Sequence, residues 1–242
     1  MGAKGKIGLI GLAVMGANLA RNLAGHGIST VVYNRSHDKT ENFLKEFGSD
    51  TNLSGAAALE ELVNSLEKPR KIILMIKAGE AVDAMIAKLI PLLEKDDILI
   101  DGGNSFFEDT RRRSRAMEAL GVHLVGMGVS GGEEGALHGP SLMPGGTREA
   151  YDALAPILKA VSAKAEGEAC VDYMGPDGAG HYVKMVHNGI EYADMQMIAD
   201  TYFVMKNVLG MTAEEMADTW KTWNKGELSS YLVEITARIL RK

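Results

Sequence analysis

The chain has 242 residues, of which 46% are hydrophobic and 24% charged, so it is long enough to bury one large core or one and a half. A formal net charge of −6 argues against non-specific nucleic-acid binding, and the short apolar runs predict neither a signal peptide nor a membrane span. The single cysteine, Cys170, excludes an intramolecular disulfide framework, and together these features predict a cytoplasmic protein.

The amino-terminal segment has the pattern of a dinucleotide-binding site. A buried strand is predicted at Lys6–Ile10, followed by a glycine-containing turn, a helix and a second strand at Ser29–Tyr33. In the turn, Gly11 permits a tight bend, the small Ala13 admits a pyrophosphate, and Gly16 lets the helix pack on the strand. Because alanine replaces the usual middle glycine, the motif is incomplete, and the prediction depends on its strand–turn–helix–strand context.

The end of the second strand indicates which dinucleotide is bound. A carboxylate is usual there, about 20 residues past the turn, where the ribose 2′-hydroxyl of NAD is recognised. This chain has Asn34, Arg35 and Ser36 instead. A guanidinium and a hydroxyl can pair with a 2′-phosphate, so these residues favour NADP. The alternative is that Arg35 is an ordinary surface arginine, but its position at the strand terminus argues against that.

Strands and helices alternate through the next part of the chain. This alternation predicts an α/β fold with a Rossmann-like, doubly wound, mostly parallel sheet. Ligands of such sheets bind beyond the carboxyl ends of the strands, which places segments 76–79, 101–105 and 128–132 on the cofactor side. The predicted helices are 38–47, 56–66, 81–93, 107–120 (rich in arginine) and 148–161, and the predicted strands are 71–76, 97–101, 122–127 and 170–174.

Two segments, 130–136 and 144–146, hold too many glycines to be predicted as helix or strand. We expect loops that approach a ligand closely, with plain connecting turns as the alternative. Asn104 and Ser130 can each hydrogen-bond a hydroxyl or carboxylate, whereas Lys77 is either a phosphate or ribose contact or a solvated strand end. No cluster of His, Cys, Asp and Glu has metal-ligand spacing, so no metal is expected.

A breaker cluster at 175–180 places the predicted domain boundary. The first domain, 1–178, is the dinucleotide-binding domain, and 179–242 is the beginning of an all-helical domain. Helices are predicted at 181–209, from a capping box at Thr212 onward, and at 228–241. Such a helical segment has little to pack against besides the first domain, so the chain is expected either to dimerise or to be part of a longer protein.

The first of these helices has a polar face with the groups for acid–base chemistry. Helical spacing gathers an amine, an imidazole, an amide and a carboxylate from Lys184, His187, Asn188 and Glu191. Such a set can remove one proton and deliver another while it holds a polar substrate. A solvated helix face is the alternative. Apolar residues follow the same spacing on roughly the opposite face; they are Val186, Ile190, Ala193 and Met197.

With these motifs in order, nearly the whole chain resembles the decarboxylating 6-phosphogluconate dehydrogenase family of long, dimeric type, within the β-hydroxyacid dehydrogenases. The resemblance implies binding of NADP, and its cofactor residues are Gly11, Leu12, Ala13, Val14, Met15, Gly16, Asn34, Arg35, Ser36, Ile76, Lys77, Ala78 and Asn104. It also implies substrate contacts, and these are made by Asn104, Ser130, Gly131, Gly132, His187, Asn188 and Tyr192, the last with the phosphate.

The resemblance further implies oxidative decarboxylation of 6-phosphogluconate to ribulose 5-phosphate, a step of the pentose phosphate pathway. Lys184 is implied as the base and Glu191 as the acid. A related dehydrogenase that oxidises without decarboxylation is one alternative, although it has no need of a second acid such as Glu191. A non-catalytic NADP-binding module is another. The family's chains continue for roughly as many residues again in a helical dimerisation domain, so this chain is expected to be a truncated form and the full-length protein a homodimer.

Overall fold

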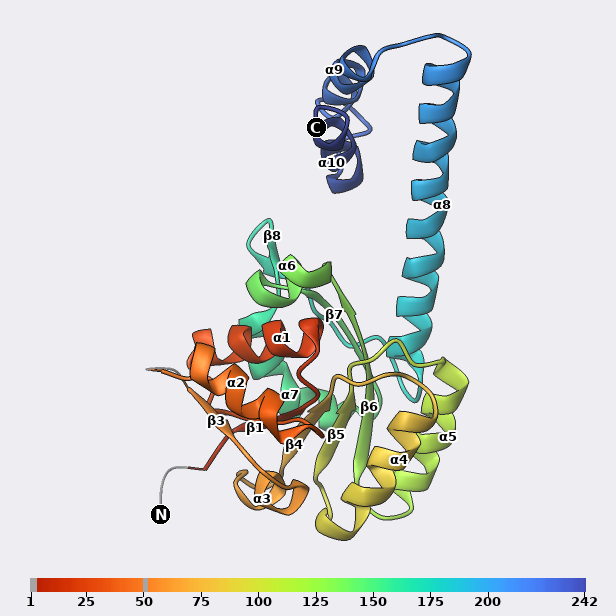
Figure 1. Ribbon diagram of the computed structural model, residues 1–242. Helices are drawn as coiled ribbons and strands as arrows, with labels where there is room; N and C mark the ends of the chain where they lie inside the picture. Colours follow the sequence, from red (N-terminus) through yellow and green to blue (C-terminus); the bar gives the residue numbers. More distant parts are fainter. Residues whose placement is uncertain (1–3, 50–51) are drawn as a thin grey trace. The chain divides into compact units, whose positions relative to one another are not determined.

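The computed structural model describes residues 4–49 and 52–242 (Figure 1). Among them, seven strands form one sheet with the order β3-β2-β1-β4-β5-β6-β7. All neighbours pair in parallel except β6 and β7, which are antiparallel. The strands are β1 Ile7–Ile10, β2 Thr30–Tyr33, β3 Leu53–Gly55, β4 Lys71–Leu74, β5 Ile98–Asp101, β6 His123–Ser130 and β7 Ser141–Gly145, and a separate hairpin joins β8 Lys164–Ala165 to β9 Glu168–Ala169.

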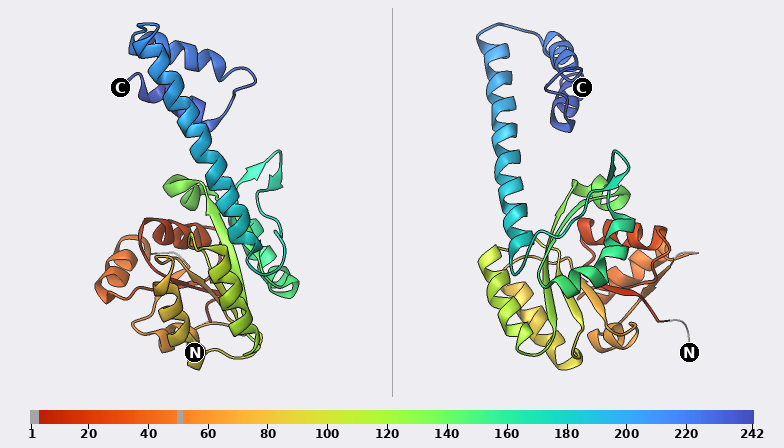
Figure 2. Two further views of the ribbon diagram at one scale, coloured as in Figure 1. Left: turned by 90° about the vertical axis from the view of Figure 1, so that its right-hand side faces the viewer. Right: turned by 180° about the vertical axis from the view of Figure 1, so that it is seen from behind.

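Helices cover both faces of this sheet, as the two views of Figure 2 show. They are α1 Val14–Gly25, α2 His37–Phe47, α3 Leu59–Asn64, α4 Glu80–Leu89, α5 Phe107–Glu118, α6 Gly132–His138 and α7 Arg148–Val161, with a short 3-10 turn at Ile90–Leu92. The prediction of a Rossmann-like, doubly wound and mostly parallel sheet is confirmed.

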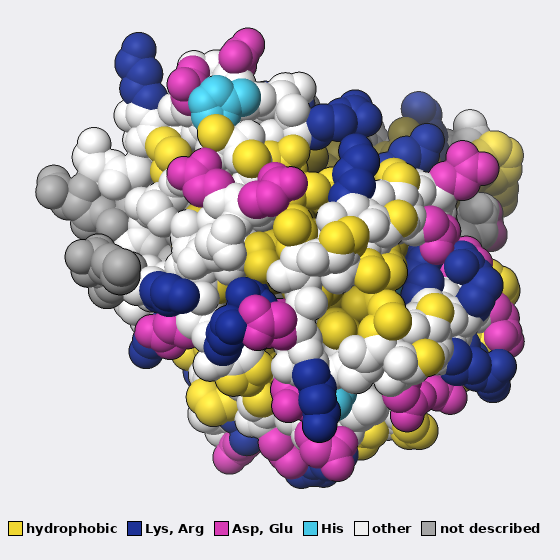
Figure 3. Space-filling view, turned by 90° about the horizontal axis from the view of Figure 1, so that it is seen from below, with side chains coloured by type: hydrophobic (Ala, Val, Ile, Leu, Met, Phe, Trp, Pro, Cys, Tyr) yellow, Lys and Arg dark blue, Asp and Glu magenta, His cyan; other side chains and the backbone are white. Residues whose placement is uncertain are grey.

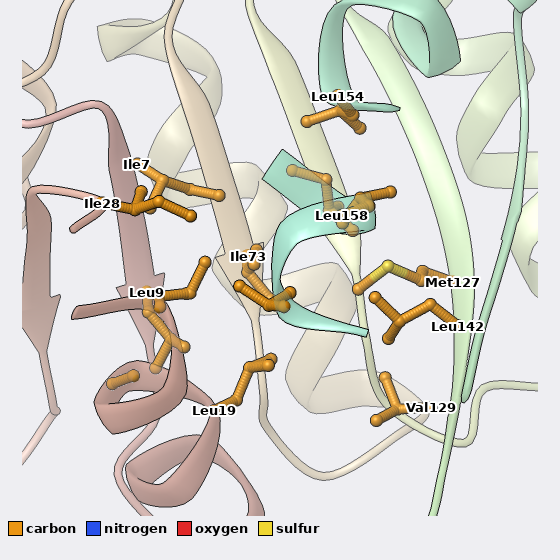
Figure 4. Packing of buried hydrophobic residues seen from close by; sticks show 14 of the residues in the cluster. Ile7, Leu9, Leu19, Ile28, Ile73, Met127, Val129, Leu142, Leu154 and Leu158 are labelled. Carbon is orange, nitrogen blue, oxygen red and sulfur yellow. The ribbon is translucent and has the colours of Figure 1, made fainter. Parts of the chain in front are cut away.

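Side-chain alternation along the strands builds the two hydrophobic cores. In β4, Ile73 packs with α1 and α7 on one face (Figure 4), whereas Ile72 and Leu74 pack with α3 and α4 on the other. In β5, Leu99 faces the second core, and its two neighbours face the first. Because both faces are covered, the strands are nearly continuous apolar runs, which is why the sequence identified them.

The sequence was wrong about the glycine-rich segments. Residues 132–138 form helix α6, and Pro144 and Gly145 lie inside strand β7. The glycine of this strand reflects close packing, because a Cβ at Gly145 would lie 2.3 Å from the backbone nitrogen of Gly180. The segment is therefore strand at the point where helix α8 (Ala179–Asn207) begins.

The predicted strand at 170–174 is also wrong. Only Val171 forms a bridge, to Leu142, and the regular pairing in this region lies earlier, in the β8–β9 hairpin. In place of the helix predicted at 56–66 the structure has the shorter helix α3. The short edge strand β3 was not predicted. A three-residue edge strand has too few alternating positions for its pattern to be recognised.

The chain divides into two compact units, Met1–Met185 and Val186–Lys242, and helix α8 (Ala179–Asn207) contributes to both. The predicted domain boundary after residue 178 stays a prediction. The second unit is all helical, with α9 (Ala213–Trp223) and α10 (Tyr231–Ile239). Its own small core is formed by Met205, Met216, Trp220, Val233 and Ala237.

The predicted capping box of α9 is confirmed, since the Thr212 side chain accepts from the Glu215 backbone and the Glu215 side chain accepts from the Thr212 backbone.

None of the described helices is long and apolar enough to cross a membrane. On the face shown in Figure 3, acidic and basic side chains are interspersed among hydrophobic ones.

Candidate active site

A cavity of about 650 Å³ opens at the carboxyl ends of the parallel strands. It brings together most of the predicted cofactor segments, which lie far apart in the sequence. Its lining includes Gly11, Ala13, Met15, Asn34, Arg35, Ser36, Ile76, Lys77, Asn104 and Val129. The other predicted residues of these segments, Leu12, Val14, Gly16 and Ala78, are not part of this lining, nor are Ser130, Gly131 and Gly132 at the end of β6.

The turn after β1 has the geometry of a phosphate-binding loop. Gly11 has φ +105°, and a Cβ there would lie 2.4 Å from the Met75 carbonyl oxygen. Ala13 is the N-cap of α1 and has no side-chain acceptor, so the first amides of the helix stay available to an anion. The backbone N–H of Leu12 donates to Asn34 Oδ1 at 3.1 Å and ties this turn to the end of β2.

The segment after β2 places cationic and hydroxyl groups at the start of α2. Arg35 and Ser36 are exposed, and Ser36 is the N-cap of the helix, where the dipole favours negative charge. Asn34 is held by its side chain, which donates to the Ser36 carbonyl at 3.2 Å. Sequence reasoning missed Lys39 and Lys88, which also line the cavity. Lys39 lies three residues after Ser36, and this helical spacing could have indicated that the two residues share one face of α2. Lys88 reaches the cavity only because α4 packs beside it, which the sequence did not indicate.

The loop after β5 is fixed by the buried carboxylate of Asp101. One oxygen accepts from the Gly103 backbone at 3.1 Å and the other from the Ser105 hydroxyl at 2.6 Å. These bonds close the loop around Asn104, whose exposed side chain borders the cavity. The sequence singled out Asn104 but not the carboxylate that holds it.

An arginine on α5 balances this carboxylate and connects two loops. Arg113 donates to both Asp83 oxygens at 2.9 and 2.8 Å and to the Gly79 carbonyl at 3.0 Å. Its remaining nitrogen lies 3.6 Å from Asp101 Oδ2. The hydrogen bond from Arg113, helped by one from Arg112, lowers the pKa of Asp83 from 3.8 to about 2.

This pair gives a testable pH dependence. A carboxyl whose pKa is depressed in the folded state stabilises the fold above its unfolded pKa, and this contribution is lost as pH falls from about 4 toward 2. In Asp83→Asn, the free energy of unfolding should therefore change less steeply over that range than in the wild type. Because the Asp83 side chain is 38% exposed, solvent screening keeps the difference modest. Urea unfolding at several pH values measures this difference. If the unfolding free energies of the two proteins changed equally with pH, the stabilising role assigned to Asp83 and Arg113 would be contradicted.

The amino-terminal turns of α8 lie against the sheet. Lys184 is 7% exposed and packs on β6, where a Cβ at Gly128 would lie 2.6 Å from the Lys184 Cβ. The predicted helix 181–209 agrees with α8, which continues through both proposed acid–base residues.

The remaining residues of the predicted polar face belong to the second unit. His187 Nδ1 lies 3.2 Å from Asn188 Oδ1 and 3.6 Å from a carboxylate oxygen of Glu191. Tyr192 is exposed, as are the apolar residues of the other face, Val186, Ile190, Ala193 and Met197. The predicted polar residues are thus grouped on their helix, and their roles stay predictions.

Family models and curated relatives match almost the whole chain. The model of the NAD binding domain of 6-phosphogluconate dehydrogenase matches residues 6–175, and that of the 6-phosphogluconate dehydrogenase C-terminal domain matches 180–242. The chain is 60% identical to the NADP(+)-dependent, decarboxylating 6-phosphogluconate dehydrogenase of Bacillus subtilis over 99% of its own length and 51% of the relative's. A decarboxylating 6-phosphogluconate dehydrogenase of Staphylococcus aureus is 59% identical, with 98% of this chain and 51% of that one covered.

Solved structures of dehydrogenases have the same fold as this chain. The 6-phosphogluconate dehydrogenase of Plasmodium falciparum, determined in apo form, with NADP+ and with 6-phosphogluconate, superimposes with a TM-score of 0.94 at 48% identity, covering 98% of this chain and 51% of that one. A 3-hydroxyisobutyrate dehydrogenase of Salmonella typhimurium, at 20% identity and a TM-score of 0.76, covers 98% of this chain and 79% of its own and shares the fold. The chain spans about half the length of the curated relatives it matches. It belongs to the 6-phosphogluconate dehydrogenase family.

Proposed function

We propose that this chain supplies the NADP site and the catalytic helix of a cytoplasmic, decarboxylating 6-phosphogluconate dehydrogenase. The reaction converts 6-phospho-D-gluconate and NADP+ into D-ribulose 5-phosphate, CO2 and NADPH, in the pentose phosphate pathway. The observation that carries the proposal is the convergence, around one cavity, of the phosphate-binding turn, Arg35 with Ser36, and the Asn104 loop. The burial of Lys184 against β6 and the relatives described above support it.

The residues around the cavity fit NADP. The free amides at the start of α1 suit the pyrophosphate, and the close backbone packing at Gly11 leaves that turn no room for a side chain. Arg35 and Ser36 would hold the 2′-phosphate, with Lys39 as a further cation nearby, and Ile76–Ala78 and Asn104 would contact the rest of the cofactor. When bound, the nicotinamide supplies the hydride acceptor.

Lys184 acts first in this mechanism. Its neutral amine takes the proton of the substrate's 3-hydroxyl as the hydride leaves C3. The resulting 3-keto acid loses CO2, because the carbonyl beta to the carboxylate accepts the electron pair of the breaking bond. The ammonium of Lys184 then stabilises the enolate oxygen.

Glu191 completes the reaction by giving a proton to C1 of this enolate, which restores the carbonyl as the ketone of ribulose 5-phosphate. An amine and a carboxyl group seven residues apart lie on one side of the same helix, which suits action at two substrate atoms. Asn104, Ser130, Gly131, Gly132, His187 and Asn188 hold the carboxylate and hydroxyls, and Tyr192 the phosphate. The second acid favours decarboxylation over simple oxidation. We also propose that the protein forms a homodimer, in line with the exposed apolar residues of α8.

The direct test adds 6-phosphogluconate to the chain with NADP+ and follows the absorbance of reduced nicotinamide and the release of CO2. Formation of both products supports the decarboxylating enzyme. Reduced cofactor without CO2 would favour a non-decarboxylating dehydrogenase. Binding of NADPH without any turnover would assign this chain the role of a cofactor-binding module.

Cofactor selectivity provides a prediction at Arg35. Charge-assisted hydrogen bonds are worth about 1.5–3 kcal/mol, so Arg35→Ala should weaken NADPH binding by roughly 10- to 100-fold. The affinity for NADH, which has no 2′-phosphate, should change less than about twofold. Fluorescence titration with both cofactors measures this, and Arg115→Ala, an exposed arginine on α5, is the control. An equal loss for NADPH and NADH would contradict the 2′-phosphate assignment.

A further inference from the structure

A buried polar pair connects α5 with the first turn of α8. The His181 side chain is 1% exposed, and its Nδ1 lies 2.7 Å from the hydroxyl of Thr110, which is fully buried. Within the described parts of the chain, Nε2 of His181 has no hydrogen-bond partner. Burial lowers the pKa of His181, against the opposing influence of Asp101, and favours a neutral ring. The Thr110 hydroxyl is thus a direct partner of Nδ1 of this ring, and the backbone of Asp101 and Gly103 also acts on the ring.

Two glycines of β6 seat this turn of the helix. A Cβ at Gly126 would lie 2.8 Å from His181 Nδ1 and 2.7 Å from the Thr110 methyl, and a Cβ at Gly128 would lie 2.6 Å from the Lys184 Cβ. Residues two apart on a strand share one face of the sheet. His181 and Lys184, three apart on α8, therefore rest on successive positions of the same strand face. A shift of His181 along β6 would move Lys184 with it.

The same stretch of α5 is tied to the cofactor loops. Arg113, three residues after Thr110, bonds the Gly79 carbonyl and Asp83 and lies beside the Asp101 carboxylate that closes the Asn104 loop. One side of α5 thus contacts both the cavity loops and the base of α8. Asp101 and Arg113 are also the charged groups whose fields act on His181.

We propose that Thr110 and His181 are positioning residues, which fix the place of Lys184 against β6 relative to the Asn104 loop. The role of Lys184 as base rests on the proposed function, whereas its placement does not. In this proposal the two residues act through Lys184 and not on the substrate themselves.

The test compares Thr110→Val, which keeps the shape and removes the hydroxyl, with Thr110→Ser, which keeps the hydroxyl. Ser114→Ala removes a hydroxyl elsewhere on α5 and is the matched control. Trace acetylation with acetic anhydride, read by mass spectrometry of each peptide, reports the placement of the Lys184 amine. In Thr110→Val the acetylation rate of Lys184 should rise about fivefold or more while that of Lys71 stays constant. In Thr110→Ser and Ser114→Ala both rates should stay within twofold of the wild type.

Steady-state kinetics with 6-phosphogluconate and NADP+ give the second measurement. Loss of one buried hydrogen bond predicts a kcat about tenfold lower for Thr110→Val, with NADPH affinity unchanged and recovery in Thr110→Ser. An unchanged Lys184 rate, or an equal rise at the partly buried Lys71, would overturn the positioning role. Absence of oxidation in the wild type would contradict the proposed function alone, because the acetylation comparison would still decide the placement of Lys184.

Discussion

Replacing Lys184 with methionine is expected to lower the rate of 6-phosphogluconate oxidation by about 10³-fold or more. A positioned general base contributes roughly 10² to 10⁴ in rate, and the substitution removes the amine while leaving a side chain of similar length. Lys184 is 7% exposed and packs on β6 through its stem, which methionine can replace, so the fold should persist. NADPH affinity should stay within about twofold, because Lys184 is not part of the cavity lining.

The measurement pairs steady-state oxidation with NADPH titration of the same preparation. Lys221→Met, at an exposed position of α9, controls for the loss of a positive charge. A Lys184→Met variant that oxidises substrate at the wild-type rate would show that another group is the base. Loss of NADPH binding together with activity would instead indicate that Lys184 supports the cofactor site.

Replacing Gly16 with alanine should damage both the fold and the cofactor site. A Cβ at Gly16 would lie 1.9 Å from the Gly11 carbonyl oxygen, and because that oxygen belongs to the backbone, the turn itself has to move. Overpacking of this kind costs about 1–3 kcal/mol, occasionally more. The displaced turn carries the amides that would hold the pyrophosphate, so NADPH affinity should fall at least about 100-fold. Urea unfolding and NADPH titration measure the two effects.

The same helix offers a control substitution that is expected to raise, and not lower, the free energy of unfolding. Gly25, the last residue of α1, has open space around its Cβ position. Gly25→Ala should therefore leave NADPH affinity unchanged and raise the unfolding free energy by up to about 1 kcal/mol through helix propensity. Equal unfolding midpoints for the two variants would contradict the packing argument for Gly16.

Much of the first unit was predictable because its signals are local. The turn at Gly11, the apolar strands and Arg35 at the end of β2 each depend on short-range spacing, and the cavity does bring them together. The helical face with Lys184 and Glu191 was equally visible, since one uninterrupted helix contains it. Where one element sufficed to place a residue, the structure has it on the predicted element, and the roles of these residues stay predictions.

Glycine was the main source of error, because a missing side chain is compatible with a loop, with a strand under a helix and with a helix start. The sequence therefore did not show that Gly145 is in a strand or that 132–138 is a helix. It also missed Asp101, Thr110 and His181, whose importance depends on partners far away in the chain. Buried polar groups look like ordinary polar residues until their partners are known.

The sequence by itself determined the alternating sheet, the glycine turn after β1, the placement of Arg35 and Ser36 at the end of β2 and the order of groups on α8. These features depend on periodicity and spacing within one or two neighbouring elements. Only the tertiary structure decided how deeply Lys184 lies on β6, which loops share one cavity, and that α5 ties them together. Those features depend on contacts between distant segments, where a difference of about one ångström separates close packing from a clash.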